Sequence, residues 1–289
     1  MINLLSNTQP KVAFIGAGNM GGAILRGLVK QGYPLPSLMA TGRDEIKLQQ
    51  LAKETGISVT TDNLQAVAWA DLVVLGVKPQ MMQAVCASLA ASVQQKKPLL
   101  LSIAAGLTTA TLLDWLGGDL PLVRSMPNTP SLLGAGVAGL YATASVSTQQ
   151  RAWVEAISTA VGTAHWVTEE AQLNAVTAIS GSGPAYYFLF TEALAAAGEK
   201  LGLTPELALQ LAKSTAAGAG KMLAESTDSP AELRRKVTSP GGTTEQAIQT
   251  FANKGLPELV EAATQAAAKR AVELATALKN SKISSANVE

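Results

Sequence analysis

Short apolar runs and longer helical stretches alternate through residues 1–167. The clearest apolar runs are residues 12–15, 71–77 and 99–104. Each is long enough for one strand and almost wholly apolar, as expected where both faces of a parallel strand are buried. Further strands are predicted at residues 37–41, 58–60 and 121–127, and edge strands at 136–142 and 163–167. This pattern predicts an α/β N-terminal domain of Rossmann type with a mostly parallel sheet.

The pattern changes at Thr168, after which strand signals vanish and alanine-rich helical stretches continue to about residue 278. The stretch 186–201 is so rich in Ala and Leu that little of its circumference is polar. A helix that is apolar nearly all round must be buried, which indicates contact with a second subunit. We therefore predict a dinucleotide-binding domain at 1–167, an all-α dimerisation and substrate domain at 168–280, and a flexible tail at 281–289.

Composition narrows the function classes. The net charge is +1, which gives no electrostatic case for nucleic acid or an anionic membrane. The single cysteine, Cys86, excludes an intramolecular disulfide and a multi-cysteine metal site, and the single histidine, His165, cannot form a metal site by itself. The chain begins with no signal sequence and has no apolar span of membrane length, so we expect a cytoplasmic protein.

A glycine fingerprint follows the first predicted strand. Gly16, Gly18 and Gly21 have G-x-G-x-x-G spacing, and a helix is predicted directly after them. In this motif the first glycine permits a tight turn, the second lets a pyrophosphate approach the backbone, and the third lets helix and strand pack closely. Amides at the helix start would face the phosphates. The loop Gly16, Ala17, Gly18, Asn19, Met20 and Gly21 is therefore expected to bind a dinucleotide.

The end of the second predicted strand indicates which nicotinamide cofactor is used. An acidic residue there would hold the ribose 2′-hydroxyl of NADH. Here the chain has Thr41 and Arg43, with Lys47 one turn later. A hydroxyl and a guanidinium suit a 2′-phosphate, so NADPH is expected, with NADH as a weaker alternative. The alternative role for Arg43 is a solvated side chain at a helix start.

A second glycine-containing loop, residues 239–244, opens onto a helix late in the chain. Gly241 and Gly242 leave the backbone bare, and Ser239, Thr243 and Thr244 supply hydroxyls. Several N–H groups can converge on one anion there, such as a substrate carboxylate. Thr243 and Gln246 have capping-box spacing, so an ordinary capped turn is the alternative.

Six stretches together resemble the pyrroline-5-carboxylate reductase family over essentially the whole chain. They are FIGAGNMG at 14–21, GVKP at 76–79, SIAAG at 102–106, RSMPNTP at 124–130, AISGSGPAY at 178–186 and TSPGGTT at 238–244. The first is common to nicotinamide enzymes, whereas the last two in this order are highly specific. The resemblance implies reduction of the cyclic imine 1-pyrroline-5-carboxylate to L-proline by hydride transfer from NADPH, the last step of proline biosynthesis.

The resemblance also implies residue roles. Asn63, Val77, Lys78, Pro79 and Ala104 would approach the cofactor. Ser239, Gly242, Thr243 and Thr244 would bind the substrate, with Thr244 nearest the imine as the catalytic residue. One of Glu169 and Glu170 would lie near the substrate, and Lys236 would stand where the family often has a polar contact to the cofactor. The family forms a homodimer with shared active sites, in some cases assembled into a decamer.

Two other functions fit part of this pattern. A β-hydroxyacid dehydrogenase shares the architecture but carries a catalytic Lys on the first helix of its second domain. Residues 169–179 include Asn174 and no lysine, which disfavours that class. A non-catalytic NADP-binding sensor or scaffold would explain the glycine fingerprint but not the second loop.

Overall fold

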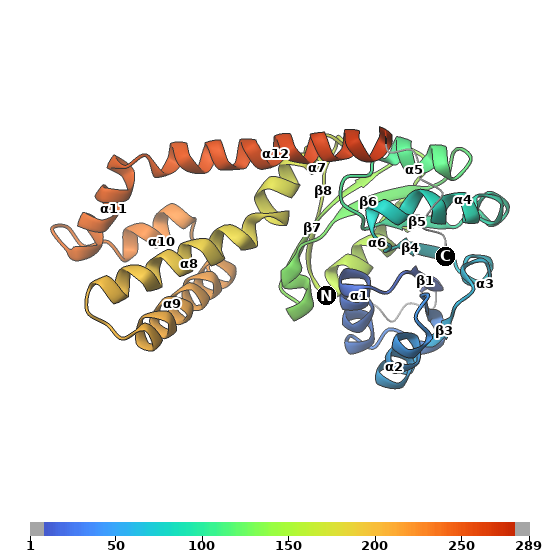
Figure 1. The fold of residues 1–289 in the computed structure, drawn as a ribbon, viewed down its shortest axis with the longest axis horizontal. Helices are drawn as coiled ribbons and strands as arrows, with labels where there is room; N and C mark the ends of the chain where they lie inside the picture. Colours follow the sequence, from blue (N-terminus) through green and yellow to red (C-terminus); the bar gives the residue numbers. More distant parts are fainter. Residues whose placement is uncertain (1–8, 281–289) are drawn as a thin grey trace. The chain divides into compact units, whose positions relative to one another are not determined.

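The computed structural model describes residues 9–280, and contacts divide the chain into two compact units (Figure 1). One unit runs to Gly181 and includes the chain again from Ala268, and the other is Ser182–Ala267. The predicted limits 1–167 and 168–280 divide the chain by expected role, into cofactor and substrate domains, and stay a prediction. The predicted tail at 281–289 lies outside the described residues.

The first unit is built on one eight-stranded sheet in the order β3-β2-β1-β4-β5-β6-β7-β8. Only the β6–β7 pair is antiparallel among its neighbouring strands. The mostly parallel Rossmann-type sheet is therefore confirmed. The strands are β1 Val12–Ile15, β2 Leu38–Thr41, β3 Ser58–Thr60, β4 Leu72–Leu75, β5 Leu99–Ser102, β6 Leu122–Met126, β7 Gly136–Ala142 and β8 Gly162–Trp166.

Helices cover both faces of this sheet. They are α1 Asn19–Lys30, α2 Glu45–Thr55, α3 Asn63–Trp69, α4 Pro79–Lys96, α5 Thr109–Trp115, α6 Thr148–Thr159 and α7 Gln172–Val176. Short 3-10 helices η1 Leu35–Ser37 and η2 Thr129–Leu133 and a π-helical turn, η3 Thr177–Gly181, complete the unit. The final part of α12 Leu256–Asn280 also belongs to it.

Alternate residues of β1 belong to two separate cores. Val12 and Phe14 pack in the core with α1 and α6, whereas Ala13 and Ile15 pack in the core with α3 and α4. All four are at most 1% exposed. This explains the continuous apolar run, because a strand covered by helices on both sides has no polar face. One edge prediction was wrong: β7 pairs with both β6 and β8, so β8 alone of that pair is an edge.

The second unit consists of helices α8 Gly183–Lys200, α9 Pro205–Glu225, α10 Pro230–Lys236, α11 Thr243–Asn253 and the first part of α12. Helices α8 and α9 pack closely, since a Cβ on Gly198 would lie 3.1 Å from the Cβ of Ala208. The buried apolar side chains among the described residues of this unit are Ala195, Ala208 and Ala212. These small side chains form little core, which leaves most of the apolar surface of α8 uncovered within one chain.

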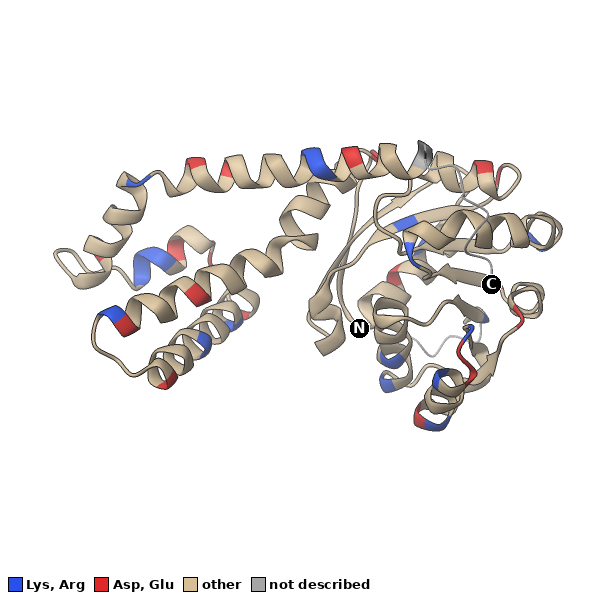
Figure 2. Ribbon diagram, viewed as in Figure 1, with Lys and Arg blue, Asp and Glu red and all other residues tan. Residues whose placement is uncertain are grey.

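Charged residues of both signs are interspersed along the helices of each unit (Figure 2). This matches the net charge of +1. Within residues 9–280, helices that combine the length and hydropathy needed for a membrane span are absent.

Candidate functional site

The glycine loop after β1 has the geometry expected of a phosphate cradle. Gly16 has a φ of +88°, a conformation that side chains rarely adopt, and its N–H donates to the Thr41 carbonyl at 3.2 Å. A Cβ on Gly21 would lie 2.9 Å from the Gly16 carbonyl oxygen, whereas a Cβ on Gly18 would meet no atom within 4 Å. The first glycine therefore shapes the turn, the third permits close packing, and the second leaves open space above the backbone.

Both glycine loops lead into helices whose first amides lack a side-chain cap. Helix α1 begins after Gly18 and α11 begins after Gly242, and neither N-cap offers a side chain to the first turn. Side-chain caps begin α2, α3, α5, α6, α9 and α10, whereas α4, α7 and α8 also begin without one. The first N–H groups of an α-helix have no internal acceptor, so an uncapped start can donate to an anion.

The predicted cofactor residues of the first unit lie together at the carboxyl ends of the parallel strands. They lie at or after the ends of β1, β2, β3, β4 and β5, which are neighbouring parallel strands, so their carboxyl ends meet there. Ala17, Asn19 and Met20 lie at the start of α1. Val77, Lys78 and Pro79 connect β4 to α4, with Lys78 as N-cap and Pro79 as the first helical residue. Ala104 is buried directly after β5.

Two of the predicted cofactor residues bind each other. Thr41 is 1% exposed, and its hydroxyl donates to the side-chain oxygen of Asn63 at 2.6 Å. The carbonyl of Thr41 accepts from the amides of Gly16 and Ala17. Thr41 therefore ties the glycine loop to α3, and its hydroxyl is engaged within the protein.

Arg43 is exposed and follows β2. Its guanidinium Nη2 lies 3.7 Å from the sulfur of Met81, and it forms no ion pair within residues 9–280. Lys47 instead pairs with Asp44, the N-cap of α2, at 3.2 Å. The backbone amide and the ammonium of Lys47 hold the pKa of the Asp44 carboxyl below its usual value. Of Arg43 and Lys47, Arg43 is therefore the one without an acidic partner among residues 9–280.

The second loop, residues 239–244, lies in the second unit and keeps its hydroxyls free. The N–H of Gly242 donates to the carbonyl of Ser239 at 3.0 Å, which closes a turn. Within the described part of the chain, the hydroxyls of Ser239, Thr243 and Thr244 make no hydrogen bond. The predicted capping box was wrong: Gly242 is the N-cap, and Glu245 rather than Gln246 reaches back, accepting from the N–H of Gly241 at 2.7 Å. The glycine run moves the helix start one residue earlier than the hydroxyls suggested.

Glu170, one of the two glutamates predicted to lie near the substrate, has partners within the first unit. The carboxylate of Glu170 binds Arg124 of β6 at 3.1 Å and accepts from the N–H and the hydroxyl of Thr109, each at 2.7 Å. It therefore links β6 to the start of α5. This contact spans 46 residues, and nothing in the sequence pattern indicated it. Lys236 similarly pairs with Asp228 at 2.6 Å.

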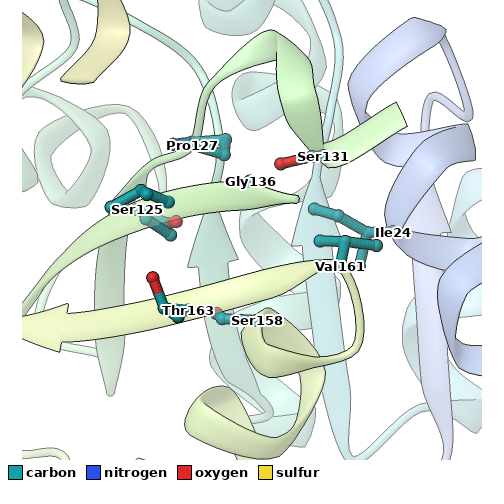
Figure 3. Close-up of a pocket in the computed structure, with 10 residues that line it drawn as sticks. Ile24, Ser125, Pro127, Ser131, Gly136, Ser158, Val161 and Thr163 are labelled. Atoms are coloured by element: carbon teal, nitrogen blue, oxygen red, sulfur yellow. The ribbon is translucent and has the colours of Figure 1, made fainter. Parts of the chain in front are cut away.

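A cavity in the first unit is too small for a substrate. It has a volume of about 10 Å³, room for one water molecule, under the loop that follows β6 (Figure 3). The residues around it come from α1, β6, η2, β7, α6 and β8, and include the hydroxyls of Ser125, Ser131, Ser158 and Thr163. Ser125, Ser131 and Ser158 are buried, whereas Thr163 is exposed. The three buried hydroxyls suit a structural water, a role that the sequence pattern did not indicate.

Family models match both parts of the chain. The model described as "Pyrroline-5-carboxylate reductase dimerisation" matches residues 170–274, and the one described as "NADP oxidoreductase coenzyme F420-dependent" matches residues 11–106.

Curated and solved relatives span nearly the whole chain. The pyrroline-5-carboxylate reductase of Pseudomonas aeruginosa is 50% identical over 94% of this chain and 99% of its own. That of Vibrio alginolyticus is 45% identical over 91% of this chain and 97% of its own. The solved pyrroline-5-carboxylate reductase from Coxiella burnetii is 44% identical with a TM-score of 0.90, covering 92% of this chain and 99% of its own. The pyrroline carboxylate reductase of Plasmodium falciparum, solved with NADP bound, is 29% identical with a TM-score of 0.78, covering 92% and 98%.

Proposed function

The chain belongs to the pyrroline-5-carboxylate reductase family, and from this we propose which residues carry its reaction and which cofactor it prefers. It is an oxidoreductase that reduces 1-pyrroline-5-carboxylate to L-proline, the last step of proline biosynthesis. The observation that carries the assignment of the substrate residues is the loop 239–244, with three free hydroxyls before and within an uncapped helix start.

The first unit fits NADPH. The open space over Gly18 and the uncapped start of α1 would hold the pyrophosphate. Arg43 would bind the 2′-phosphate, because a guanidinium forms charge-assisted hydrogen bonds with phosphate oxygens. Asn63, Val77, Lys78, Pro79 and Ala104 would border the rest of the cofactor. The bound cofactor supplies the hydride.

The second unit would hold the substrate. The amides of Thr243 and Thr244, with the hydroxyls of Ser239 and Thr243, would bind the carboxylate. The hydroxyl of Thr244 would lie nearest the ring nitrogen. A pyrroline nitrogen is basic enough to arrive protonated as the iminium, so the nitrogen receives the C=N electron pair and needs no further proton. The chain's residues therefore act mainly by orienting the substrate carbon toward the hydride donor.

The protein is a homodimer through its family dimerisation segment. We propose further that both chains complete each active site and that dimers can assemble into a decamer, as the family resemblance implies. A cytoplasmic location also stays a prediction.

Loss of NADPH absorbance on adding 1-pyrroline-5-carboxylate tests the assignment. We expect stoichiometric L-proline, and transfer of deuterium from labelled NADPH to the δ-carbon of proline. NADPH binding without oxidation would instead support the non-catalytic sensor. Faster oxidation with NADH would contradict the role given to Arg43 while leaving the reaction unchanged.

A further inference from the structure

The loop before α11 contains a tight turn with one spare amide. Pro240 and Gly241 are the central residues of the turn that the Gly242–Ser239 hydrogen bond closes at 3.0 Å. Gly241 has a φ of +68°, as the third residue of a type II turn requires. The turn's own hydrogen bond does not use the N–H of Gly241. That N–H is therefore free to donate elsewhere.

Glu245 takes this amide. Its Oε2 accepts from the N–H of Gly241 at 2.7 Å, and it has no ion-pair partner among residues 9–280. A glutamate at the third helical position ordinarily reaches back to the N-cap amide. Here the N-cap amide, that of Gly242, is already bound to Ser239, so the carboxylate reaches one residue further. The contact locks the turn onto the first turn of α11.

The negative charge of Glu245 lies beside a loop that is proposed to bind an anion. The loop is proposed to bind the carboxylate of the substrate, and a second negative charge nearby opposes that binding. The side chain of Glu245 must therefore make a favourable contribution to binding that offsets the repulsion between the two carboxylates. Two consecutive glycines make the free loop costly to order, and a loop fixed before binding leaves less ordering to be done by the ligand.

We propose that Glu245 is a positioning residue of the substrate loop. By holding the amide of Gly241, it fixes residues 239–242 so that the amides of Thr243 and Thr244 and the hydroxyls of Ser239 and Thr243 face the substrate carboxylate together. This inference rests on the proposed function of the loop. Glu245 acts through the loop backbone and does not touch the substrate.

Three substitutions separate reach from charge. Glu245→Ala removes the contact, Glu245→Asp keeps the charge on a side chain one methylene shorter, and Glu245→Gln keeps an acceptor at full length without the charge. Gln246→Ala is the matched control, because it alters the same helical turn at an exposed side chain with no hydrogen bond. Each variant is assayed as the full-length enzyme with 1-pyrroline-5-carboxylate and with 1-pyrroline, which has the same imine and no carboxylate.

We expect Glu245→Ala and Glu245→Asp to raise KM for 1-pyrroline-5-carboxylate about tenfold, the effect of losing one organising hydrogen bond to a charged group. Their kcat, their KM for NADPH and their kcat/KM for 1-pyrroline should stay near the wild-type values. Glu245→Gln should recover most of the affinity, and Gln246→Ala should match the wild type.

Equal losses on both substrates would overturn the proposal, because they would indicate a general structural role. An unchanged KM in Glu245→Ala, or a Glu245→Gln variant as impaired as Glu245→Ala, would overturn it too. Failure of the proposed function looks different: the wild-type enzyme itself would then show no preference for the substrate that carries the carboxylate. Should Glu245→Ala not fold, the Asp and Gln variants still decide between reach and charge.

Discussion

The hydroxyl of Thr41 donates a 2.6 Å hydrogen bond to the side-chain oxygen of Asn63, across the end of β2 and the start of α3. Both residues were predicted to contact the cofactor, and the structure shows that they orient each other. With the Thr41 hydroxyl engaged, Arg43 remains the side chain at the end of β2 that suits a 2′-phosphate.

Replacing Arg43 with Asp should move cofactor preference from NADPH toward NADH. A carboxylate repels the 2′-phosphate and accepts from a 2′-hydroxyl. Loss of a hydrogen bond to a charged group, roughly 1.5–3 kcal/mol, corresponds to about a ten- to hundredfold loss in kcat/KM for NADPH. Steady-state constants for both cofactors measure it. Thr41→Val is the control and should affect both cofactors equally; a selective loss of NADPH activity would show that Thr41 does bind the phosphate.

Thr244→Ala should keep the fold, the dimer and NADPH affinity but lose about ten- to a hundredfold in kcat/KM, at about 1.4 kcal/mol per tenfold. The start of a helix offers an anion only about 0.3–1 kcal/mol, too little to orient a small substrate. The hydroxyl should therefore decide the geometry. Thr244→Ser should recover most of the loss because it restores the hydroxyl. Wild-type activity in the alanine variant would reduce Thr244 to a structural residue of the first turn.

The buried ion pair between Arg124 and Glu170 should matter for stability. The Arg124 side chain is 5% exposed, and Arg124→Met would leave the Glu170 carboxylate with only the two Thr109 donors. Breaking a buried pair from one side typically costs about 3–5 kcal/mol. We expect urea unfolding, at fixed protein concentration, to show a loss near the lower end of that range. Arg26→Met, which breaks the half-exposed pair with Glu54, is the control and should cost much less.

Helix α8 should carry the dimer interface. Tyr187, Phe188 and Leu189 are between 66% and 69% exposed in the single chain. Large apolar side chains grouped on one helix indicate a protein interface. Leu189→Glu should therefore shift sedimenting enzyme toward monomer and lower its activity, whereas Lys30→Glu on α1 should do neither. A stable and active monomer would contradict both the interface and the shared active site.

Cys86 should be unreactive in the folded enzyme. Cys86 lies on α4 and is fully buried in the core. Burial raises the pKa of its thiol to about 12. At pH 8 the thiol therefore stays protonated, and only the thiolate reacts quickly. A chromogenic disulfide reagent should label the protein only after unfolding. Because the folded pKa is raised, this group's contribution to stability is full below the ordinary thiol pKa and is lost as pH rises toward 12.

Local chemistry accounts for what the sequence predicted well. The buried strands follow from apolar runs, because helices on both faces of the sheet leave these strands no polar side. The turn at Gly16 and the close packing at Gly21 were also predicted correctly. The contact of Gly18 with a phosphate stays a prediction.

Contacts between distant residues account for what it missed. The π-helical turn η3 depends on Asn128, which donates to the Ser180 carbonyl at 3.0 Å, and on Gly181, where a Cβ would lie 2.7 Å from the Met126 methyl carbon. The Glu170–Arg124 pair likewise has no local signal. The apolar stretch 186–201 was predicted to be buried against a second subunit. In the single chain several of its large apolar side chains are exposed, so a local pattern cannot show what buries them.

The uncapped starts of α1 and α11 have a consequence for protein engineering. Serine at Gly18, where a Cβ would meet no atom within 4 Å, would add a capping hydroxyl and stabilise the helix by a few tenths of a kcal/mol. At Gly242 a Cβ would lie 3.0 Å from the Ser239 carbonyl oxygen, which opposes such a gain. The hydroxyl at position 18 would compete for the amides that a phosphate needs. A screen for heat resistance alone would thus favour a serine that fills the proposed phosphate site, and stabilising this enzyme without disabling it means sparing Gly18.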